Sequence, residues 1–208
     1  MEKKILIAVP CMDSVAVGFC ESLATLKKVG NCKVAFKVGS LIYASRNELA
    51  KIAVKEEYDY IVWFDSDMVF EPDTLQRLVK HLDEGKDIIS GIYFRRAIPY
   101  TPVLFKWLDP NSILNSWQGY DDYPKNSVFE IAGMGFGCVA MKTDVLLDTG
   151  ESGQWFTPIK GFGEDLSFCI RAKEKGYKIW CDSSIKLGHT SHSIVNEDFY
   201  EVFRESRK

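Results

Sequence analysis

The feature that most limits how this chain can fold is a regular alternation between short apolar runs and amphipathic stretches. Residues 5–9 and 61–64 are continuous apolar runs, which is typical of strands buried on both faces of a sheet. Amphipathic stretches of helical period lie between and after such runs. The alternation predicts an α/β fold with a mixed, mainly parallel central sheet that is flanked by helices.

The other elements follow from the same pattern. Helices are predicted at residues 15–29, 45–57, 71–85 and 164–175, and further strands at 33–38, 87–90, 102–107, 128–131, 136–141 and 177–181. Ser45 and Glu48 form a capping box that is expected to start the second helix. Residues 108–127 break the pattern, and we interpret them as either a binding loop or a tolerated surface insertion.

Length and composition narrow the class of protein. A chain of 208 residues with 46% hydrophobic and 26% charged residues is expected to form one folded domain. No apolar run approaches the roughly 20 residues of a membrane helix, so no membrane span is predicted. A formal net charge of −3 makes nucleic acid an unexpected partner. The six scattered cysteines indicate free thiols in a reducing compartment.

Two carboxylates directly follow the central apolar run. Asp65 and Asp67 are separated by one residue, so in an extended segment their side chains share a face. They are expected at the carboxyl end of a central strand, where open α/β sheets bind ligands. A divalent cation would relieve their repulsion, and oxygen ligands suit Mg²⁺ or Mn²⁺. A solvated turn is the alternative interpretation.

Two polar clusters lie further along the chain. Glu164 and Asp165 begin a predicted helix, where they either balance the helix dipole or place a general base at the mouth of a pocket. His189 and His192 follow the last predicted strand, and an imidazole there can complete a Mn²⁺ site.

Three other charged or titratable residues have a simpler interpretation. Arg95 and Arg96 follow a predicted strand and are expected to be a solvated basic pair, with contact to a diphosphate or an anionic acceptor as the alternative. His81 lies on an amphipathic helix and is predicted to face solvent.

The order of these motifs resembles that of nucleotide-sugar glycosyltransferases of the GT-A fold, most of all the family-2-type enzymes and their short bacterial and viral relatives. The resemblance extends from residue 5 to about residue 192. It implies a single GT-A domain over residues 1–208, with a nucleotide-binding half at 1–107 and an acceptor-binding and catalytic half at 108–208. The motifs that carry it are Asp65-Ser66-Asp67, Gly133-Met134-Gly135, Gly163-Glu164-Asp165 and Gly188-His189.

The resemblance also implies a cofactor and a nucleotide site. Asp67 matches the direct ligand of a Mn²⁺ or Mg²⁺ ion, and His189 matches a further ligand. Asp65 matches a carboxylate that contacts the ribose or base and sometimes reaches the metal. The remaining residues implied on the nucleotide side are Pro10, Arg46, Ser66 and His192.

Catalytic and sugar-binding roles follow from the same resemblance. Asp165 matches the general base of inverting members, and Glu164 beside it would contact the donor or acceptor sugar. Gly135, Trp155 and Phe156 are implied on the sugar side, although Trp155 is equally well interpreted as a core residue. The implied enzyme is a metal-dependent hexosyltransferase in the cytoplasm, soluble, and in the host cytoplasm if the chain is viral. Its donor would be a UDP-sugar, with UDP-glucose as the first choice, and its acceptor a hydroxyl of a glycan, glycoconjugate or protein.

Two alternatives remain open at this stage. The residues from Asp65 to Val69 also fit the nucleophile motif of haloacid-dehalogenase-like phosphatases, in which Asp65 would attack phosphate. That motif usually follows a first strand, whereas two strand–helix units precede it here. The second alternative is a non-catalytic module that binds a nucleotide sugar or glycan, against which the retention of Asp67, Asp165 and His189 argues.

Overall fold

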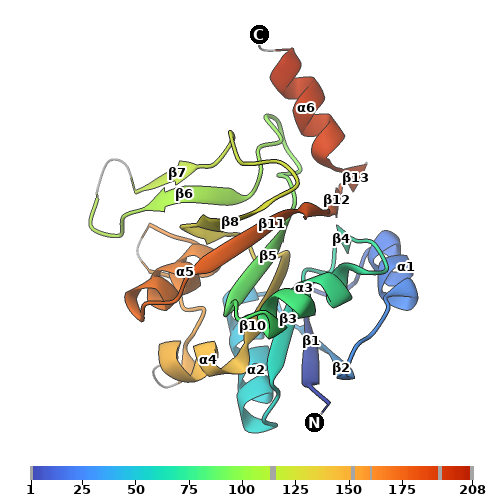
Figure 1. Cartoon of the computed structure of the whole chain (residues 1–208), viewed down its shortest axis with the longest axis vertical. Coiled ribbons are helices and arrows are strands. Elements are labelled where there is room, and N and C mark those ends of the chain that lie inside the picture. The colour runs from blue at the N-terminus through green and yellow to red at the C-terminus, as the bar shows by residue number, and fades with distance from the viewer. Residues whose placement is uncertain (1, 113–115, 151–152, 160, 192–193, 207–208) are drawn as a thin grey trace.

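The computed structural model describes residues 2–112, 116–150, 153–159, 161–191 and 194–206 (Figure 1). Within them, one sheet has seven strands in the order β2-β1-β3-β10-β5-β11-β8. These are β1 (Lys4–Cys11), β2 (Asn31–Val38), β3 (Tyr60–Phe64), β5 (Ile88–Ile92), β8 (Val128–Ile131), β10 (Cys138–Lys142) and β11 (Ile179–Lys186). Strands β1, β2, β3, β5 and β11 point the same way, and β8 and β10 run against them. The prediction of a mixed, mainly parallel α/β sheet is confirmed.

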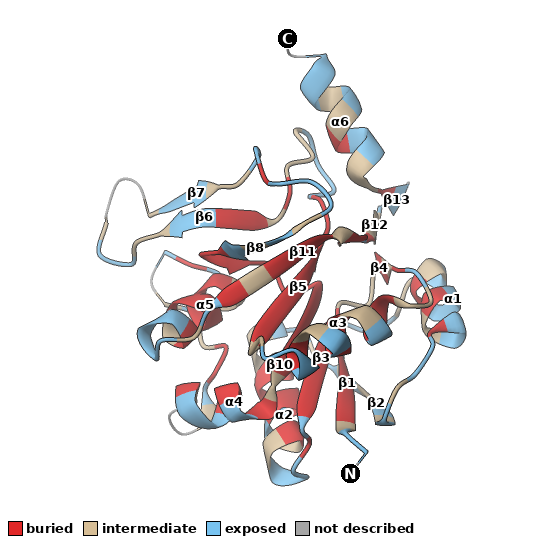
Figure 2. Ribbon diagram, in the orientation of Figure 1, coloured by how far each residue is buried: buried red, intermediate tan, exposed pale blue. Residues whose placement is uncertain are grey.

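Two sets of helices cover the two faces of this sheet. Helices α1 (Val17–Thr25) and α3 (Thr74–Asp83) pack on one face, and α2 (Ile42–Lys55), α4 (Thr143–Thr149) and α5 (Glu164–Glu174) pack on the other. Successive side chains of a strand point to opposite faces. Val62 and Phe64 therefore pack in the core beneath α1 and α3, and Ile61 and Trp63 pack in the core beneath α2, α4 and α5. Figure 2 shows the central strands buried and the helices exposed on their outer sides.

Strand β10 lies in the centre of the sheet although it follows β3 and β5 in the sequence. It pairs antiparallel with both of them and thereby joins the β2-β1-β3 part of the sheet to the β5-β11-β8 part. The carbonyl oxygen of Gly137, just before β10, accepts a hydrogen bond of 3.2 Å from the backbone N–H of Asp65. The insertion therefore also fixes the backbone at the point where β3 ends.

Two small sheets lie beside the main one. The first contains β4 (Met68–Val69), β12 (Gly188–Thr190) and β13 (Ile194–Val195), and it places His189 opposite Met68. The second contains β6 (Leu104–Leu108), β7 (Trp117–Gly119) and β9 (Gly133–Met134). Strand β7 falls within residues 108–127, so the prediction of a continuous irregular loop there is wrong in that part.

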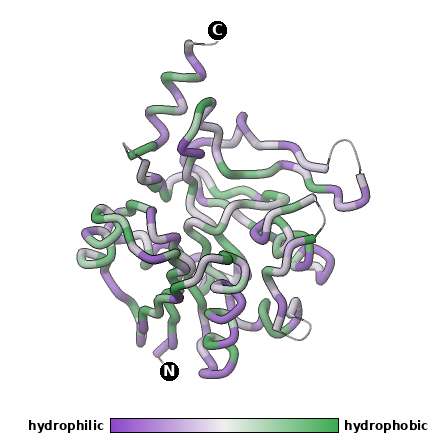
Figure 3. The backbone as a smooth tube through the Cα atoms, turned by 180° about the vertical axis from the view of Figure 1, so that it is seen from behind, coloured by the Kyte–Doolittle hydropathy of each residue, from purple (hydrophilic) through white to green (hydrophobic). Residues whose placement is uncertain are grey.

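Helix α6 (Glu197–Glu205) projects from the body of the molecule in Figure 1. Hydrophobic and hydrophilic residues alternate along it, as Figure 3 shows from behind. Its buried Tyr200 stacks on Phe94 with ring centroids 5.2 Å apart, and the Tyr200 hydroxyl donates to the carbonyl oxygen of Asp121. The end of the described chain is thus packed against the segment that follows β5.

Several local predictions need correction. Helix α2 begins at Ile42 with Leu41 as its N-cap, so Ser45 and Glu48 do not form a capping box; Ser45 is buried in the first turns instead. His81 does not face solvent, because its Nε2 lies 2.9 Å from the buried carboxylate of Asp182. None of the helices in the described part of the chain combines the length and apolar composition needed to cross a membrane.

Candidate active site

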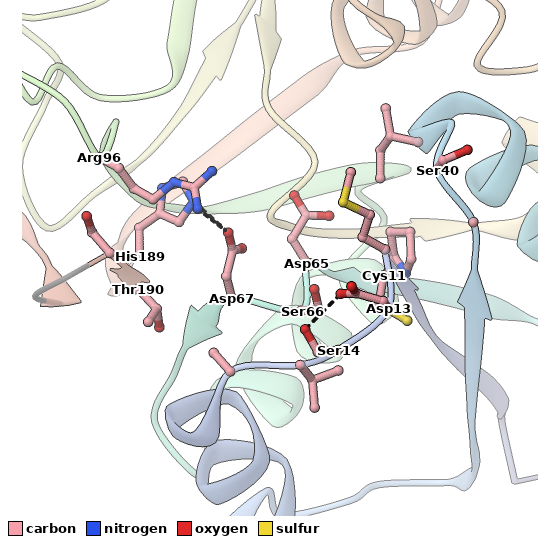
Figure 4. A pocket seen from close by; sticks show the side chains of 17 residues that line it. Cys11, Asp13, Ser14, Ser40, Asp65, Ser66, Asp67, Arg96, His189 and Thr190 are labelled. Carbon is pink, nitrogen blue, oxygen red and sulfur yellow. Dashed lines mark hydrogen bonds and ion pairs between the residues drawn. The ribbon is translucent and has the colours of Figure 1, made fainter.

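A pocket of about 900 Å³ opens at the carboxyl ends of β1 and β3 (Figure 4). One wall comes from the residues that follow β1, the floor from the turn after β3, and the far wall from Arg96 and the β12 segment. This is the edge of the sheet at which open α/β folds bind ligands. Of the residues predicted for a site, those that line this pocket are Pro10, Asp65, Ser66, Asp67 and His189.

The two aspartates lie in a turn and not in an extended segment. The backbone N–H of Met68 donates to the carbonyl oxygen of Asp65, and Ser66 accepts from the N–H of Ala16 at 2.9 Å. The prediction that Asp65 and Asp67 share a face assumed an extended segment, and this assumption is wrong. Both still line the pocket, but each carboxylate has its own set of partners.

Asp67 lies between an exposed arginine and a histidine that is 15% exposed. Its Oδ2 is 3.0 Å from a guanidinium nitrogen of Arg96 and 3.4 Å from Nε2 of His189. Burial raises the pKa of Asp67, but the hydrogen bond and charge of His189 and the charge of Arg96 outweigh it, so the pKa lies below its usual value. Asp67 is thus held as a carboxylate at the pocket wall.

The backbone sets the orientation of His189. Its Nδ1 lies 2.9 Å from the carbonyl oxygen of Phe94, and because a carbonyl can only accept, Nδ1 carries the proton. In the neutral ring, the lone pair of Nε2 then faces the Asp67 carboxylate. Two electron-rich groups in this arrangement call for a positive charge, either a second imidazole proton or a bound cation.

Asp65 has a partner that is buried. Arg46 of α2 is 2% exposed, and it donates to Oδ1 of Asp65 at 2.8 Å and to Oε1 of Glu164 at 3.4 Å. Its guanidinium carbon lies 5.4–6.0 Å from the ring centroids of Trp63, Phe136 and Phe156. Burial raises the pKa of the Asp65 carboxyl, and the charge of Arg46 acts in the opposite direction.

Asp165 begins α5 beside Glu164. Burial, followed by the charge of Glu164, raises the pKa of Asp165 to about 6, although the backbone N–H of Leu166 donates to its carboxylate at 2.7 Å. A carboxylate with this pKa is a stronger base than an ordinary aspartate and is still ionised at neutral pH. Glu164 links it to Asp65 through the shared Arg46, so the two sequence motifs meet in space.

Tyr93 fills the space left by two glycines in front of β10. A Cβ added to Gly135 would lie 2.0 Å from the Tyr93 hydroxyl oxygen, and one added to Gly137 would lie 2.8 Å from its ring. The hydroxyl oxygen accepts the Gly137 N–H at 3.2 Å, and the ring packs edge-on against His189. The glycines therefore allow a tyrosine to support the histidine from behind.

The family model described as "Glycosyl transferase family 2" matches residues 17–147. This chain belongs to glycosyl transferase family 2. The solved structure titled "Crystal Structure of A197 from STIV" is similar in fold: 20% of residues are identical, the TM-score is 0.67, and the match covers 90% of this chain and 86% of that chain. No curated protein matches. Membership of the family supports glycosyl transfer from a nucleotide-sugar donor to an acceptor, and the GT-A fold prediction is confirmed.

The matched residues of the glycosyltransferase model include Asp65, Asp67 and Gly135 but end before Asp165 and His189. The structure places His189 in the pocket through the pairing of β12 with β4, and it links Glu164, the neighbour of Asp165, to Asp65 through Arg46. The family assignment also argues against the phosphatase alternative for Asp65.

Six predicted site residues of the described chain do not line this pocket: Arg46, Gly135, Trp155, Phe156, Glu164 and Asp165. Trp155 is 5% exposed and its indole N–H donates to the carbonyl oxygen of Leu146, and Phe156 is fully buried. Both belong to the core beneath α5, so neither presents a ring to a sugar in this structure. Arg46 is near the pocket but binds carboxylates below its floor. His192 lies outside the described residues.

For Arg96 the sequence analysis expected a solvated side chain, with contact to a diphosphate or an anionic acceptor as the alternative; its side chain is 53% exposed and pairs with Asp67 in the pocket. One residue beside the site, Tyr93, escaped the sequence analysis. Tyr93 had no sequence signal of its own, although Gly135 and Gly137 mark a place where a bulky side chain approaches the backbone closely.

A metal ion in this glycosyltransferase would need ligands beyond those of the protein. Within the described residues, no group of three or more His, Cys, Asp and Glu side chains is arranged to hold one. Asp67 and His189 do converge, and Mg²⁺ and Mn²⁺ commonly take one or two protein ligands and complete their shell with phosphate oxygens and water. Asp67 and His189 are therefore suitable ligands for a cation that binds together with a diphosphate.

Proposed function

We propose that this chain transfers a hexosyl group, glucose as the first choice, from a UDP-sugar to an acceptor hydroxyl with inversion at the anomeric carbon. The observation that carries the proposal is the contrast between its two carboxylate clusters. Asp67 lies with Arg96 and His189 on an open, cationic wall, whereas Asp165 lies in a drier setting that raises its pKa to about 6. The first suits a diphosphate and the second suits a proton transfer.

Each half of the chain would supply part of the reaction. Residues 1–107 would bind the nucleotide, with the end of β1 around Pro10 against the base and Asp65 and Ser66 near the ribose. Residues 108–208 would bind the acceptor and supply Asp165 and His189. Arg96, within the first half, would contact a diphosphate oxygen once Asp67 is engaged elsewhere.

The reaction would begin at the acceptor hydroxyl. Its proton passes to a carboxylate oxygen of Asp165 as the acceptor oxygen bonds to the anomeric carbon. The bond from that carbon to the diphosphate breaks on the opposite side, and its electron pair leaves with UDP. Asp165 would contribute about 10²–10⁴-fold in rate. Glu164, held by Arg46, would orient the sugar.

Asp67 and His189 would hold the cation, Mn²⁺ or Mg²⁺. When bound, such an ion neutralises the charge that develops on the leaving diphosphate. The residues themselves contribute the geometry, because the Phe94 carbonyl and the Tyr93 ring fix the imidazole before any ligand arrives.

Calorimetric titration of the chain with UDP, in the presence and absence of Mn²⁺, tests donor binding. We expect binding that strengthens at least tenfold with Mn²⁺ and that loses this gain in Asp67→Asn. Asp122→Asn, an exposed carboxylate in another part of the chain, is the matched control. Failure of UDP to bind, or an Asp67→Asn variant that keeps the full Mn²⁺ gain, contradicts the proposal.

A second measurement separates an enzyme from a binding module. A catalytic site hydrolyses its UDP-sugar slowly when water replaces the acceptor, and Asp165→Asn should abolish that hydrolysis while UDP still binds. A binding module would show UDP binding with no hydrolysis in either form.

A further inference from the structure

Arg95 and Arg96 are neighbours that point in opposite directions. The bridge between Phe94 and Pro102 and the hydrogen bond from the N–H of Arg95 to the carbonyl of Thr101 hold the backbone as far as Arg95, and the chain bends at Arg96 and Ala97. The contacts of the two arginine side chains show that they diverge. Arg96 reaches Asp67 in the pocket, as Figure 4 shows, and Arg95 lies over the ring of Trp117 with its guanidinium carbon 5.9 Å from the centroid.

Trp117 packs on a small hydrophobic core that includes residues of α5. Its ring packs edge-on against Phe105 with centroids 5.5 Å apart, and the buried Phe105 shares a small core with Leu166. The backbone N–H of Leu166 is the group that donates to Asp165. Trp117 is therefore connected through this small core to the start of α5, where Asp165 lies. Even so, 48% of Trp117 remains exposed.

Arg95 keeps its charge free. Among the arginines that the structure describes, Arg46, Arg96 and Arg204 each pair with a carboxylate, but no carboxylate of the described residues lies within 4.0 Å of Arg95. The side chain is exposed, and the indole beneath it limits its orientations. A guanidinium that is oriented but unpaired is suited to bind a carboxylate or phosphate with two hydrogen bonds.

We propose that Arg95 and Trp117 form an acceptor subsite for a saccharide that carries a carboxylate or phosphate group. The exposed indole face would pack against the apolar C–H face of a sugar ring, and Arg95 would bind the anionic substituent. The Arg95–Arg96 segment would then separate the donor's diphosphate on one side from the acceptor's charge on the other. This inference rests on the proposed glycosyl transfer and names the substrate class on its acceptor side.

Three matched disaccharides test the subsite: a neutral one, the same one oxidised to a uronate, and the same one phosphorylated at that position. Binding to the full chain is measured by calorimetry with UDP at saturation, so that the donor pocket is filled. We expect the uronate, the phosphate or both to bind about tenfold more tightly than the neutral form. The disaccharide whose affinity increases shows whether the subsite binds a carboxylate or a phosphate.

The variants assign the effect to the two residues. Arg95→Gln should remove the preference for the anionic forms, and Trp117→Ala should weaken all three about tenfold through lost apolar contact. Trp107→Ala is the control for the tryptophan, because Trp107 pairs with Gln118 and so lies on the other face of the β6–β7 pair, with 40% of it exposed. Arg204→Gln on α6 is the control for the charge.

The outcomes separate this inference from the proposed function. Equal affinity for the neutral and anionic disaccharides, or full binding by Arg95→Gln and Trp117→Ala, overturns the subsite even when UDP binds normally. Binding of an anionic disaccharide that depends on Arg95 and Trp117, in a chain that does not bind UDP, supports the subsite and contradicts the UDP donor instead.

Discussion

Asp65 and Asp67 are one residue apart and have the same side-chain exposure, 28%, yet their surroundings move their pKa values in opposite directions. The difference lies in their partners. Asp65 meets Arg46, which is 2% exposed among aromatic rings, while Asp67 meets Arg96, which is 53% exposed, and His189. Burial of the carboxyl itself dominates at Asp65 and raises its pKa, whereas the hydrogen bond and charge of His189 and the charge of Arg96 dominate at Asp67 and lower its pKa.

The comparison shows how one turn can serve two kinds of chemistry. On the Asp67 side, charge is stabilised in contact with solvent, which is what a diphosphate and its counterion need. On the Asp65 side, a buried arginine binds two carboxylates, Asp65 and Glu164, and interacts through its charge with the proposed base beside them. Four changes to the chain can break or sharpen this contrast.

The largest expected effect is on catalysis at Asp165. Asp165→Asn keeps the shape of the side chain but removes its basicity, so transfer and hydrolysis should fall about 10²–10⁴-fold while affinity for UDP changes less than twofold. Steady-state kinetics with a UDP-sugar measure the first and calorimetry the second. Activity within a factor of three of the wild type would show that Asp165 is not the base. The buried cluster around Asp65 and Arg46 would then have no catalytic role.

Arg46 should matter next, through stability. Arg46→Gln leaves Asp65 and Glu164 without their buried cation, and such a loss costs about 3–5 kcal/mol of unfolding free energy. Urea denaturation measures it. Arg204→Gln, which removes an exposed arginine paired with Glu201, should cost less than about 1 kcal/mol. A cost for Arg46→Gln as small as that of Arg204→Gln would contradict the organising role of Arg46.

The pKa of Asp165 predicts a pH-dependent difference in stability. Because the folded state raises this pKa to about 6, the contribution of Asp165 to stability is present below about pH 4 and is lost as the pH rises through 6. Asp165→Asn has no such loss and should gain up to about 3 kcal/mol over the wild type between pH 4 and pH 7.5. Urea denaturation at both pH values measures it, with Asp122→Asn as control.

The raised pKa of Asp165 also predicts the pH dependence of activity. Because protonated Asp165 cannot accept the acceptor's proton, activity of the wild type should decline below about pH 6.

The smallest effect concerns the tyrosine behind His189. Gly135→Ala places a methyl group 2.0 Å from the Tyr93 hydroxyl oxygen and should cost about 1–3 kcal/mol. In a Tyr93→Phe background the nearest remaining atom is Cγ1 of Val103 at 2.8 Å, followed by the ring carbon at 3.1 Å, so the same substitution should cost less. Thermal unfolding of the four proteins in this cycle measures the coupling. Equal costs in both backgrounds would mean that Tyr93 does not require the glycine.

The fold was largely predictable from the sequence, because short continuous apolar runs such as residues 61–64 are typical of strands buried on both faces and alternate here with amphipathic stretches of helical period. The start of α2 was not predictable: Ser45 and Glu48 match a capping pattern, but Ser45 is buried by the tertiary structure, which overrides the local signal. Short strands such as β4 and β12 were missed because two or three residues carry no periodicity.

The site was predictable where chemistry and chain order coincide, as for Asp65, Asp67 and His189, which line one pocket. Arg96 and Trp155 show the limit. Their residue types suggested a solvated charge and a sugar platform, but only the fold decides that Arg96 turns toward Asp67 and that the indole N–H of Trp155 meets a backbone carbonyl. Side-chain partners that are distant in sequence leave no local pattern.

The central position of β10 has a consequence for synthesis of the chain. Strands β3 and β5 leave the ribosome well before β10, and at about 5–20 residues per second their facing edges wait several seconds for the strand that separates them. During that interval the edges of two mainly apolar strands are exposed and able to pair with each other instead. We expect nascent chains arrested before residue 138 to bind holdase chaperones and those arrested beyond residue 142 to bind them less.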